Sequence, residues 1–154
     1  MNRYFVIRDM IYDLVESKSH GYYKRNGYAH MFQVETICTM LAYERNLDPE
    51  LCAIIGLLHD ISIPVEFNDF AHAQKGAAYA KRMMVDTGMF SEEEIKIVET
   101  AIMNHSNKTL IQDSYSELIK DADVVSHKLD GHILKPHEKK RFEAISCLGF
   151  LRKA

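Results

Sequence analysis

The chain has 154 residues and a mass of 17.8 kDa, with 47% hydrophobic and 27% charged residues. This composition is ordinary for a globular protein and excludes a fibre or a disordered tail. A chain of this length buries on the order of 70% of its unfolded surface, so we expect one domain over residues 1–154. The 19 basic and 22 acidic residues give a net charge of −3, which provides no overall attraction for nucleic acid or an anionic membrane.

The cysteines and the apolar runs indicate where the protein resides. Cys38, Cys52 and Cys147 are odd in number, far apart in sequence and surrounded by apolar residues, as is typical of reduced core thiols in an intracellular protein. Charge appears already at Arg3, too early for the apolar region of a signal peptide. The longest strongly apolar run, Leu51–Leu58, falls far short of the ~20 residues that span a bilayer. We therefore expect a soluble, cytoplasmic protein.

The first part of the chain has the periodicity of amphipathic helices. A helix is predicted over residues 2–17, and the segment 17–28 then breaks the pattern with Gly21 and Gly27. A second helix is predicted over residues 30–45, because its apolar residues recur at i, i+3, i+4, i+7 and i+8. The segment between these two helices is interpreted as a flexible loop.

The middle of the chain contains the most apolar segment. Asp48 followed by Pro49 is a helix-start signal, and the predicted helix runs to about Ile61. It is apolar on nearly all sides, so we expect it to be central and buried. A loop is predicted over residues 64–70, and another helix over residues 71–87.

Three further helices are predicted between residue 91 and residue 152. Ser91 and Glu94 form a capping-box pattern that begins a helix ending near Asn104, and helices follow over residues 115–129 and 136–152. No convincing strand, repeat or linker is present, so the predicted fold is all-α with about six or seven helices. The last helix is expected to pack on its own core, the alternative being the face of a homodimer; its apolar residues are Phe142, Ile145, Leu148, Phe150 and Leu151.

Six metal-competent side chains lie on or beside the apolar stripes of these helices. Their helical spacing predicts that they point into the core. They are His30, His59, Asp60, His72, His105 and Asp123.

Each histidine alone is more simply explained as a core residue bonded to a backbone carbonyl. The carboxylates Asp60 and Asp123 are harder to explain, because an unpaired buried charge costs several kcal/mol. Neither of their helices carries a Lys or Arg at a spacing that would serve both carboxylates. A divalent metal satisfies both of them and several imidazoles, so the metal hypothesis is favoured for the set as a whole.

The order and spacing of these residues resemble the HD-domain superfamily. That family builds its metal site from a His, a His-Asp doublet and a distant Asp, matched here by His30, the pair His59-Asp60, and Asp123. His72 and His105 are similar to the two further histidines of the subset that holds a second metal. The resemblance covers the motif-bearing core, residues 30–129.

The resemblance implies a helical, metal-dependent phosphohydrolase that acts on a nucleotide or another small phosphate ester. A bound metal lowers the pKa of water toward ~7 and stabilises charge on the phosphoryl oxygens. Mixed imidazole and carboxylate ligands suit Mn, Fe, Co, Ni or Zn, with Mg also admitted, and the sequence does not choose among them.

The number of metal ions follows from charge. One divalent ion would only neutralise the two carboxylates, so we favour two ions bridged by Asp60, the second completed by His72 and His105. In that case Asp60, His72 and His105 are the residues closest to the reaction. If one ion binds, the two histidines would instead donate to the phosphate or carry protons.

Three basic residues are candidates for substrate contacts. Lys108, three residues past His105, is predicted to contact a substrate phosphate. Lys24 and Arg25 lie among three tyrosines in the segment 20–28, which either closes over a base or sugar phosphate or is a solvated loop. His132 and His137 are expected to face solvent. For His127, four residues after Asp123 on the same helix, a solvent-facing position is favoured over one beside the ligands.

The same ligand set is compatible with other functions. A few HD-like proteins are oxygenases, so two irons that activate dioxygen are the first alternative. The second is a non-catalytic metal-binding or sensor domain, with a tightly held, inert metal. Monoester and diester substrates both stay open.

Overall fold

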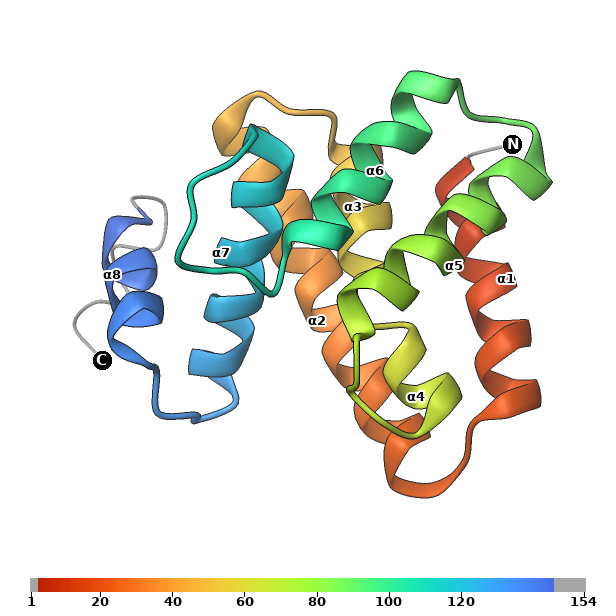
Figure 1. The fold of residues 1–154 in the computed structure, drawn as a ribbon, viewed down its shortest axis with the longest axis horizontal. Helices are drawn as coiled ribbons and strands as arrows, with labels where there is room; N and C mark the ends of the chain where they lie inside the picture. The colour runs from red at the N-terminus through yellow and green to blue at the C-terminus, as the bar shows by residue number, and fades with distance from the viewer. Residues whose placement is uncertain (1–2, 146–154) are drawn as a thin grey trace.

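The computed structural model describes residues 3–145 of the chain, which form eight helices and no strand (Figure 1). The all-α prediction is confirmed, with one helix, α4, of only five residues. The helices are α1 (Arg3–Lys18), α2 (Gly21–Arg45), α3 (Pro49–Leu58), α4 (Ser62–Glu66), α5 (His72–Thr87), α6 (Glu92–Asn104), α7 (Ser114–Leu129) and α8 (Pro136–Ala144).

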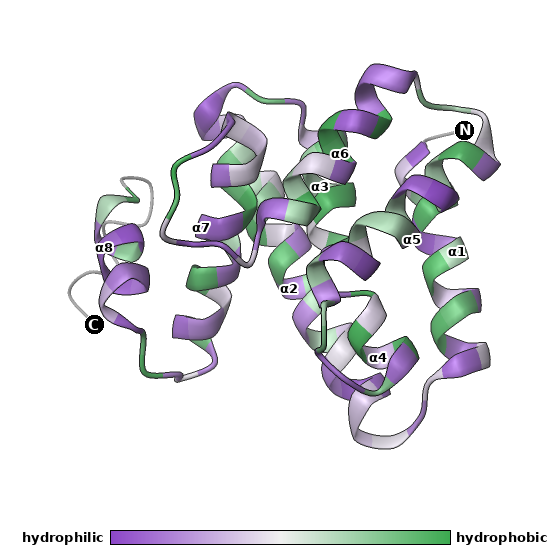
Figure 2. Ribbon diagram, viewed as in Figure 1, coloured by the Kyte–Doolittle hydropathy of each residue, from purple (hydrophilic) through white to green (hydrophobic). Residues whose placement is uncertain are grey.

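Helix α3 is the centre of the bundle, as its uniform apolarity predicts. Every residue from Leu51 to Leu58 is buried, and α3 contacts α1, α2, α5, α6 and α7. The surrounding helices alternate hydrophobic and hydrophilic residues along their length (Figure 2), as expected of amphipathic helices. Helices α5 and α6 pack side by side, and α8 lies against α7 at one end of the molecule (Figure 1).

The predicted helix starts at Asp48 and Ser91 are confirmed. The Asp48 carboxylate accepts hydrogen bonds from the backbone N–H groups of Glu50 and Leu51. Ser91 and Glu94 form a capping box in which each side chain bonds the other's backbone N–H. These caps satisfy N–H groups that a helix terminus otherwise leaves unpaired.

The predicted break over residues 17–28 is confirmed only at residues 19 and 20, which separate α1 from α2. Helix α2 begins at Gly21, whose φ of +57° suits glycine, and continues through Gly27 without interruption. Gly27 is required for packing instead: a Cβ there would lie 2.8 Å from the Cβ of Pro64. The loop expected over residues 64–70 is likewise partly helical, since α4 reaches Glu66. The sequence shows where a glycine interrupts the apolar pattern. It does not show which residue, distant in sequence, packs so closely that only glycine fits.

Helix α8 is shorter than predicted within the described residues. It ends at Ala144, and both Phe142 and Ile145 are buried against the core, so this part packs on its own chain. The other apolar residues of the predicted helix, Leu148, Phe150 and Leu151, lie outside the described residues.

Among residues 3–145, no helix is long and apolar enough to cross a bilayer. Cys38 and Cys52 are buried free thiols, as predicted, and Cys147 lies outside the described residues.

The close approach of α2 and α3 at Gly56 gives a stability prediction. A Cβ at Gly56 would lie 2.6 Å from the backbone Cα of Glu35. Because both atoms are fixed to helix backbones, no side-chain rotation can relieve the contact. Gly to Ala in an ordinary helix interior stabilises by about 1 kcal/mol. We expect Gly56→Ala to destabilise by about 1 to 3 kcal/mol instead, because of overpacking, as measured by urea unfolding.

Ala78→Gly, at an exposed position of α5, is the control for helix propensity alone. It should lose about 1 kcal/mol. An increase in stability for Gly56→Ala would show that the two helices are not held at this separation.

Candidate metal centre

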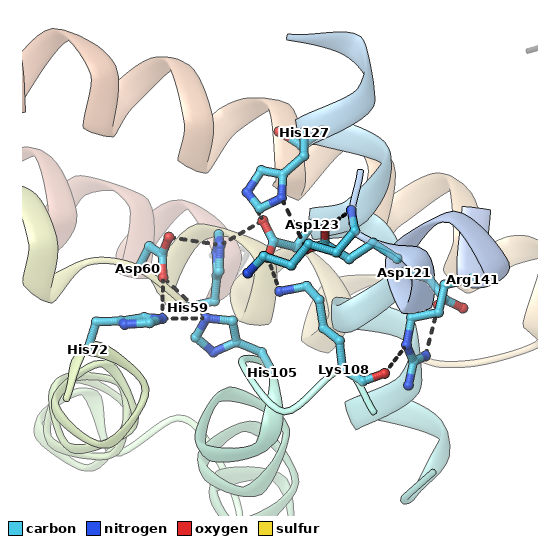
Figure 3. A network of polar contacts seen from close by, with 12 residues as sticks. His59, Asp60, His72, His105, Lys108, Asp121, Asp123, His127 and Arg141 are labelled. Atoms are coloured by element: carbon cyan, nitrogen blue, oxygen red, sulfur yellow. Dashed lines mark hydrogen bonds and ion pairs between the residues drawn. The ribbon is translucent and has the colours of Figure 1, made fainter. Parts of the chain in front are cut away.

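Five helices or helix ends bring the six predicted ligand residues into one cluster (Figure 3). His30 lies on α2 and Asp123 on α7, whereas His59 and Asp60 occupy the turn that follows α3. His72 is the first residue of α5, and His105 directly follows α6. The doublet therefore lies just beyond a helix, since α3 ends at Leu58 rather than near residue 61.

Asp60 lies between two pairs of histidines. Its Oδ2 atom is 3.5 Å from the Nε2 atoms of both His30 and His59. Its Oδ1 atom is 3.2 Å from Nε2 of His105 and 3.7 Å from Nε2 of His72. One carboxylate thus presents a different oxygen to each pair.

Asp123 joins the first pair only. Its Oδ1 atom is 3.3 Å from His30 Nε2 and 3.9 Å from His59 Nε2, and its side chain is almost fully buried. The first group therefore has two imidazoles and two carboxylates, and the second has two imidazoles and the shared Asp60. This is the division that the sequence predicted for two ions.

Backbone carbonyls fix the tautomers of three of the histidines. Because a carbonyl only accepts, each Nδ1 must carry the proton, which leaves an Nε2 lone pair directed into the cluster. The three contacts are His59 Nδ1 to Gly56 O at 2.8 Å, His72 Nδ1 to Asp69 O at 2.9 Å, and His105 Nδ1 to Ile102 O at 2.7 Å.

The fourth histidine is oriented in the same way by a hydroxyl group. Ser126 Oγ donates to the Gln33 side-chain oxygen, so it accepts from His30 Nδ1, 3.2 Å away. Contacts of this kind orient metal-binding histidines and raise their basicity.

The donor set fits a divalent metal. The Nε2 atoms of His72 and His105 are only 3.2 Å apart, and when both rings are neutral each presents a lone pair to the other. Asp60 Oδ1 and Asp123 Oδ1 are buried and have no hydrogen-bond donor among the described residues. Converging lone pairs and unpartnered carboxylate oxygens are costly unless a cation lies between them. His, Asp and the bridging position of Asp60 together supply the ligand types that transition metals bind.

Without a metal, the cluster takes its positive charge from a proton. Burial opposes a charge on His30, but its contacts with Asp123 and Asp60 outweigh burial and raise its pKa to about 10. Burial lowers the pKa of His59 to about 4. Burial also disfavours ionised Asp60 and Asp123, yet the neighbouring imidazoles hold the pKa of both carboxyls well below the usual range. A metal ion would replace the proton on His30.

Lys108 supplies a second positive charge. It lies in a loop, so the spacing of residues along the helices did not reveal its contact with Asp123. Its Nζ atom is 2.6 Å from Asp123 Oδ2, and its side chain is only 9% exposed. The sequence search covered only the helices of Asp60 and Asp123, whereas Lys108 comes from the loop between α6 and α7 and pairs with Asp123 alone. Contact with a substrate phosphate stays a prediction for this residue.

His127 lies beside the centre, which is the less favoured of its two predicted positions. Its Nε2 atom is 3.4 Å from Asp123 Oδ1. Its ring stacks on His30 with centroids 5.9 Å apart, and on His132 with centroids 5.4 Å apart. The sequence signal was its position four residues after Asp123, on the same face of α7.

Two pockets of about 200 and 490 Å³ open beside the cluster, and His30 and Asp60 line both. Tyr22 and Asn26 of α2 also line both pockets. The smaller pocket is mainly apolar; its other lining residues are Tyr23, Gly27, Met31, Ile63 and Pro64. The larger also contacts Ala29, His127, Asp130 and His132.

The basic residues of the segment 20–28 lie away from these pockets. Lys24 pairs with Glu16 of α1, and Arg25 is exposed; neither lines either pocket. The segment is helical rather than a flexible loop, and it contributes Tyr22 and Asn26 instead.

The sequence comparison identifies the family. Residues 27–128 match the HD domain. The chain belongs to the HD-domain family. Members of this family bind divalent metals, and the cluster of His and Asp residues is where this HD-domain chain could hold them.

Known proteins share the fold and part of the sequence. A predicted HD superfamily hydrolase from an uncultured Thermotogales bacterium has a similar structure, with a TM-score of 0.62, 22% identity, and coverage of 94% of this chain and 89% of its own. Ribonuclease Y of Chlorobium phaeovibrioides is 30% identical over 109 residues, 71% of this chain. Ribonuclease Y of Ureaplasma parvum is 25% identical over 96% of this chain. The chain spans only 19% and 30% of these two ribonucleases.

The shared position of Asp60 gives a prediction for metal content. Asp60→Asn keeps the shape but removes the charge that both histidine pairs face. We expect about two metal ions per wild-type chain, purified without chelators, and less than one per Asp60→Asn chain, measured by elemental analysis.

Asp86→Asn, an exposed carboxylate of α5, is the control and should retain the wild-type content. His105→Gln should lose the ion of the second group and keep that of the first. Full metal content in Asp60→Asn would place the bound ions elsewhere on the protein.

Proposed function

We propose that this HD-domain hydrolase uses one or two divalent metal ions to hydrolyse a small phosphate ester, such as a nucleotide. The observation that carries the proposal is Asp60, which directs one oxygen to each histidine pair. This arrangement suits two ions close enough to act on one phosphoryl group.

The chemistry divides between the ions and the side chains. Bound metal would supply activated water as the nucleophile and would stabilise negative charge on the phosphoryl oxygens. Asp60 and the histidines fix the geometry of the centre through their backbone partners. Lys108 neutralises one oxygen of Asp123, which leaves the other free to point inward.

The pockets support a small organic ester as the substrate. Tyr22 and Asn26 line the same two pockets as His30 and Asp60, so an aromatic ring and an amide lie beside the metal centre. An aromatic face stacks on a base, and an amide donates to or accepts from a base or sugar. Asp130, which lines the larger pocket, disfavours additional phosphate groups there.

Phosphodiester cleavage is the second candidate. It is favoured by the similarity to ribonuclease Y, although this chain spans less than a third of the two relatives described. The same two-ion geometry supports attack on a diester as readily as on a monoester.

His59→Ala tests the hydrolase proposal directly. His59 is fully buried and contacts the centre through Nε2, so its loss should lower metal-dependent turnover by at least about 100-fold. The assay measures phosphate release from nucleotides and p-nitrophenyl phosphate, and cleavage of bis-p-nitrophenyl phosphate and short RNA. Asp86→Asn serves as the control, and wild-type rates in His59→Ala would refute the assignment.

The rival functions give distinct outcomes in the same experiments. Iron-specific activity with oxygen consumption and no phosphate release would indicate the di-iron oxygenase. A tightly held metal with neither activity would indicate a structural or sensor domain.

Tyr22→Ala separates substrate binding from metal binding. Tyr22 lines both pockets but lies outside the ligand set. The variant should raise KM by about 3- to 10-fold for nucleotide substrates and leave metal content unchanged, because only stacking is lost. Tyr43→Ala, an exposed tyrosine at the other end of α2, is the matched control. An unchanged KM would show that the substrate does not contact this wall.

A further inference from the structure

Helix α8 lies outside the segment that matches the HD domain, yet it contacts the loop that carries Lys108. The match ends at residue 128, and α8 begins at Pro136. Arg141, with a side chain only 12% exposed, points from α8 toward the turn after α6 (Figure 3). The extra helix is therefore connected to the metal centre by a side chain that the family resemblance did not include.

Arg141 binds the backbone of this loop at two points. Its Nε atom donates to the carbonyl of Lys108 at 2.8 Å, and its Nη2 atom donates to the carbonyl of Leu110 at 3.0 Å. Its Nη1 atom pairs with Glu117 at 2.7 Å and Asp121 at 3.0 Å on α7. The planar guanidinium group thus fixes the loop and α7 relative to each other.

A buried lysine strengthens the same connection. Lys120 is fully buried, and its Nζ atom donates to the Leu110 carbonyl at 3.0 Å and pairs with Glu117 at 2.8 Å. The backbone of the loop is consequently held by two cations from the side away from the centre. At Lys108 itself, the N–H donates to the Ser106 carbonyl at 3.1 Å, and Arg141 is the side chain that holds the Lys108 carbonyl.

Lys108 transmits this constraint to the centre. Its carbonyl accepts from Arg141, and its own Nζ atom lies 2.6 Å from Asp123 Oδ2. That ion pair sets the rotation of the Asp123 carboxylate and directs Oδ1 toward His30. Arg141 thereby acts on the centre through one residue, without contacting it.

We propose that Arg141 of α8 is a positioning residue for the metal centre, holding Lys108 against Asp123 so that Asp123 Oδ1 is oriented for metal. The proposal rests on metal binding at this centre and not on which reaction the bound metal supports. In this proposal α8 raises the metal affinity of the centre in addition to packing against α7.

The test compares the same substitution, Arg to Lys, at two arginines that pair with the carboxylate of Asp121. Asp121 pairs with Arg141 through Oδ1 and with Arg45 through Oδ2, at 2.7 Å. Both substitutions keep the positive charge but remove the planar guanidinium group with its several N–H donors. Arg141 also contacts the Lys108 carbonyl, so only Arg141→Lys changes the contact with Lys108. Mn²⁺ affinity of the full chain is measured by calorimetry, with circular dichroism to verify folding.

Arg141→Lys should weaken Mn²⁺ binding by about tenfold, and Arg45→Lys by less than about twofold. Lys108→Met should also weaken binding. In the Lys108→Met background, Arg141→Lys should cost less than about twofold, because its effect passes through Lys108. Equal effects of the two arginine variants, or a full Arg141→Lys effect without Lys108, would overturn the proposal.

A measurement on the wild-type chain covers the case in which Arg141→Lys does not fold. Coupling between α8 and the centre is reciprocal, so Mn²⁺ should slow hydrogen exchange in residues 107–112 and 136–144. No change in α8 would refute the connection. Because both readouts are independent of turnover, failure to find phosphatase activity would refute the proposed function and leave this inference standing.

Discussion

The burial of two carboxylates, Asp60 and Asp123, is the constraint on which the rest of the structure depends. Each has an oxygen without a hydrogen-bond donor among the described residues, inside a bundle whose central helix is entirely apolar. Such groups cost several kcal/mol unless a cation compensates them. Four imidazole Nε2 atoms converge on the same space, each oriented by a partner on the other ring nitrogen. The fold supplies the geometry, and the bound metal would supply the stabilisation that this arrangement lacks.

Close helix packing is what makes this convergence sterically feasible, and small residues allow it. Gly56 lets α3 approach the backbone of α2 near Glu35, and Gly76 lets α5 approach the carbonyl of His59, where a Cβ would lie 2.6 Å away. The second contact bears directly on the site, because it brings the helix that begins with His72 against the doublet. A larger residue at position 76 would separate the two histidine pairs that share Asp60. The glycines are therefore part of how the centre is built, although none contributes a ligand.

Local sequence signals identified the helices and the candidate ligands but not the contacts between helices. The capping patterns at Asp48 and Ser91 and the apolar periodicity are properties of a few adjacent residues, so they could be identified without tertiary structure. The continuation of α2 through Gly27 could not, because it depends on Pro64, distant in sequence. The same reason explains Lys108: a search along the helix faces of Asp60 and Asp123 does not reach a loop on the other side of the centre. His127 is the exception, since its i+4 spacing from Asp123 on α7 is a local property of the sequence and is enough to place it beside the centre.

The position of Lys108 also changes the argument about the number of metal ions. Counting only carboxylates, one divalent ion leaves a neutral centre, a poor site for an anionic phosphate, and this favoured two ions. With Lys108 on Asp123, one divalent ion already leaves the centre positive, so charge alone no longer requires a second. The case for two ions then rests on His72 and His105, whose Nε2 lone pairs face each other at 3.2 Å beside the second oxygen of Asp60. Lone pairs in that arrangement need their own cation, which a single ion held by His30, His59 and Asp123 would not provide.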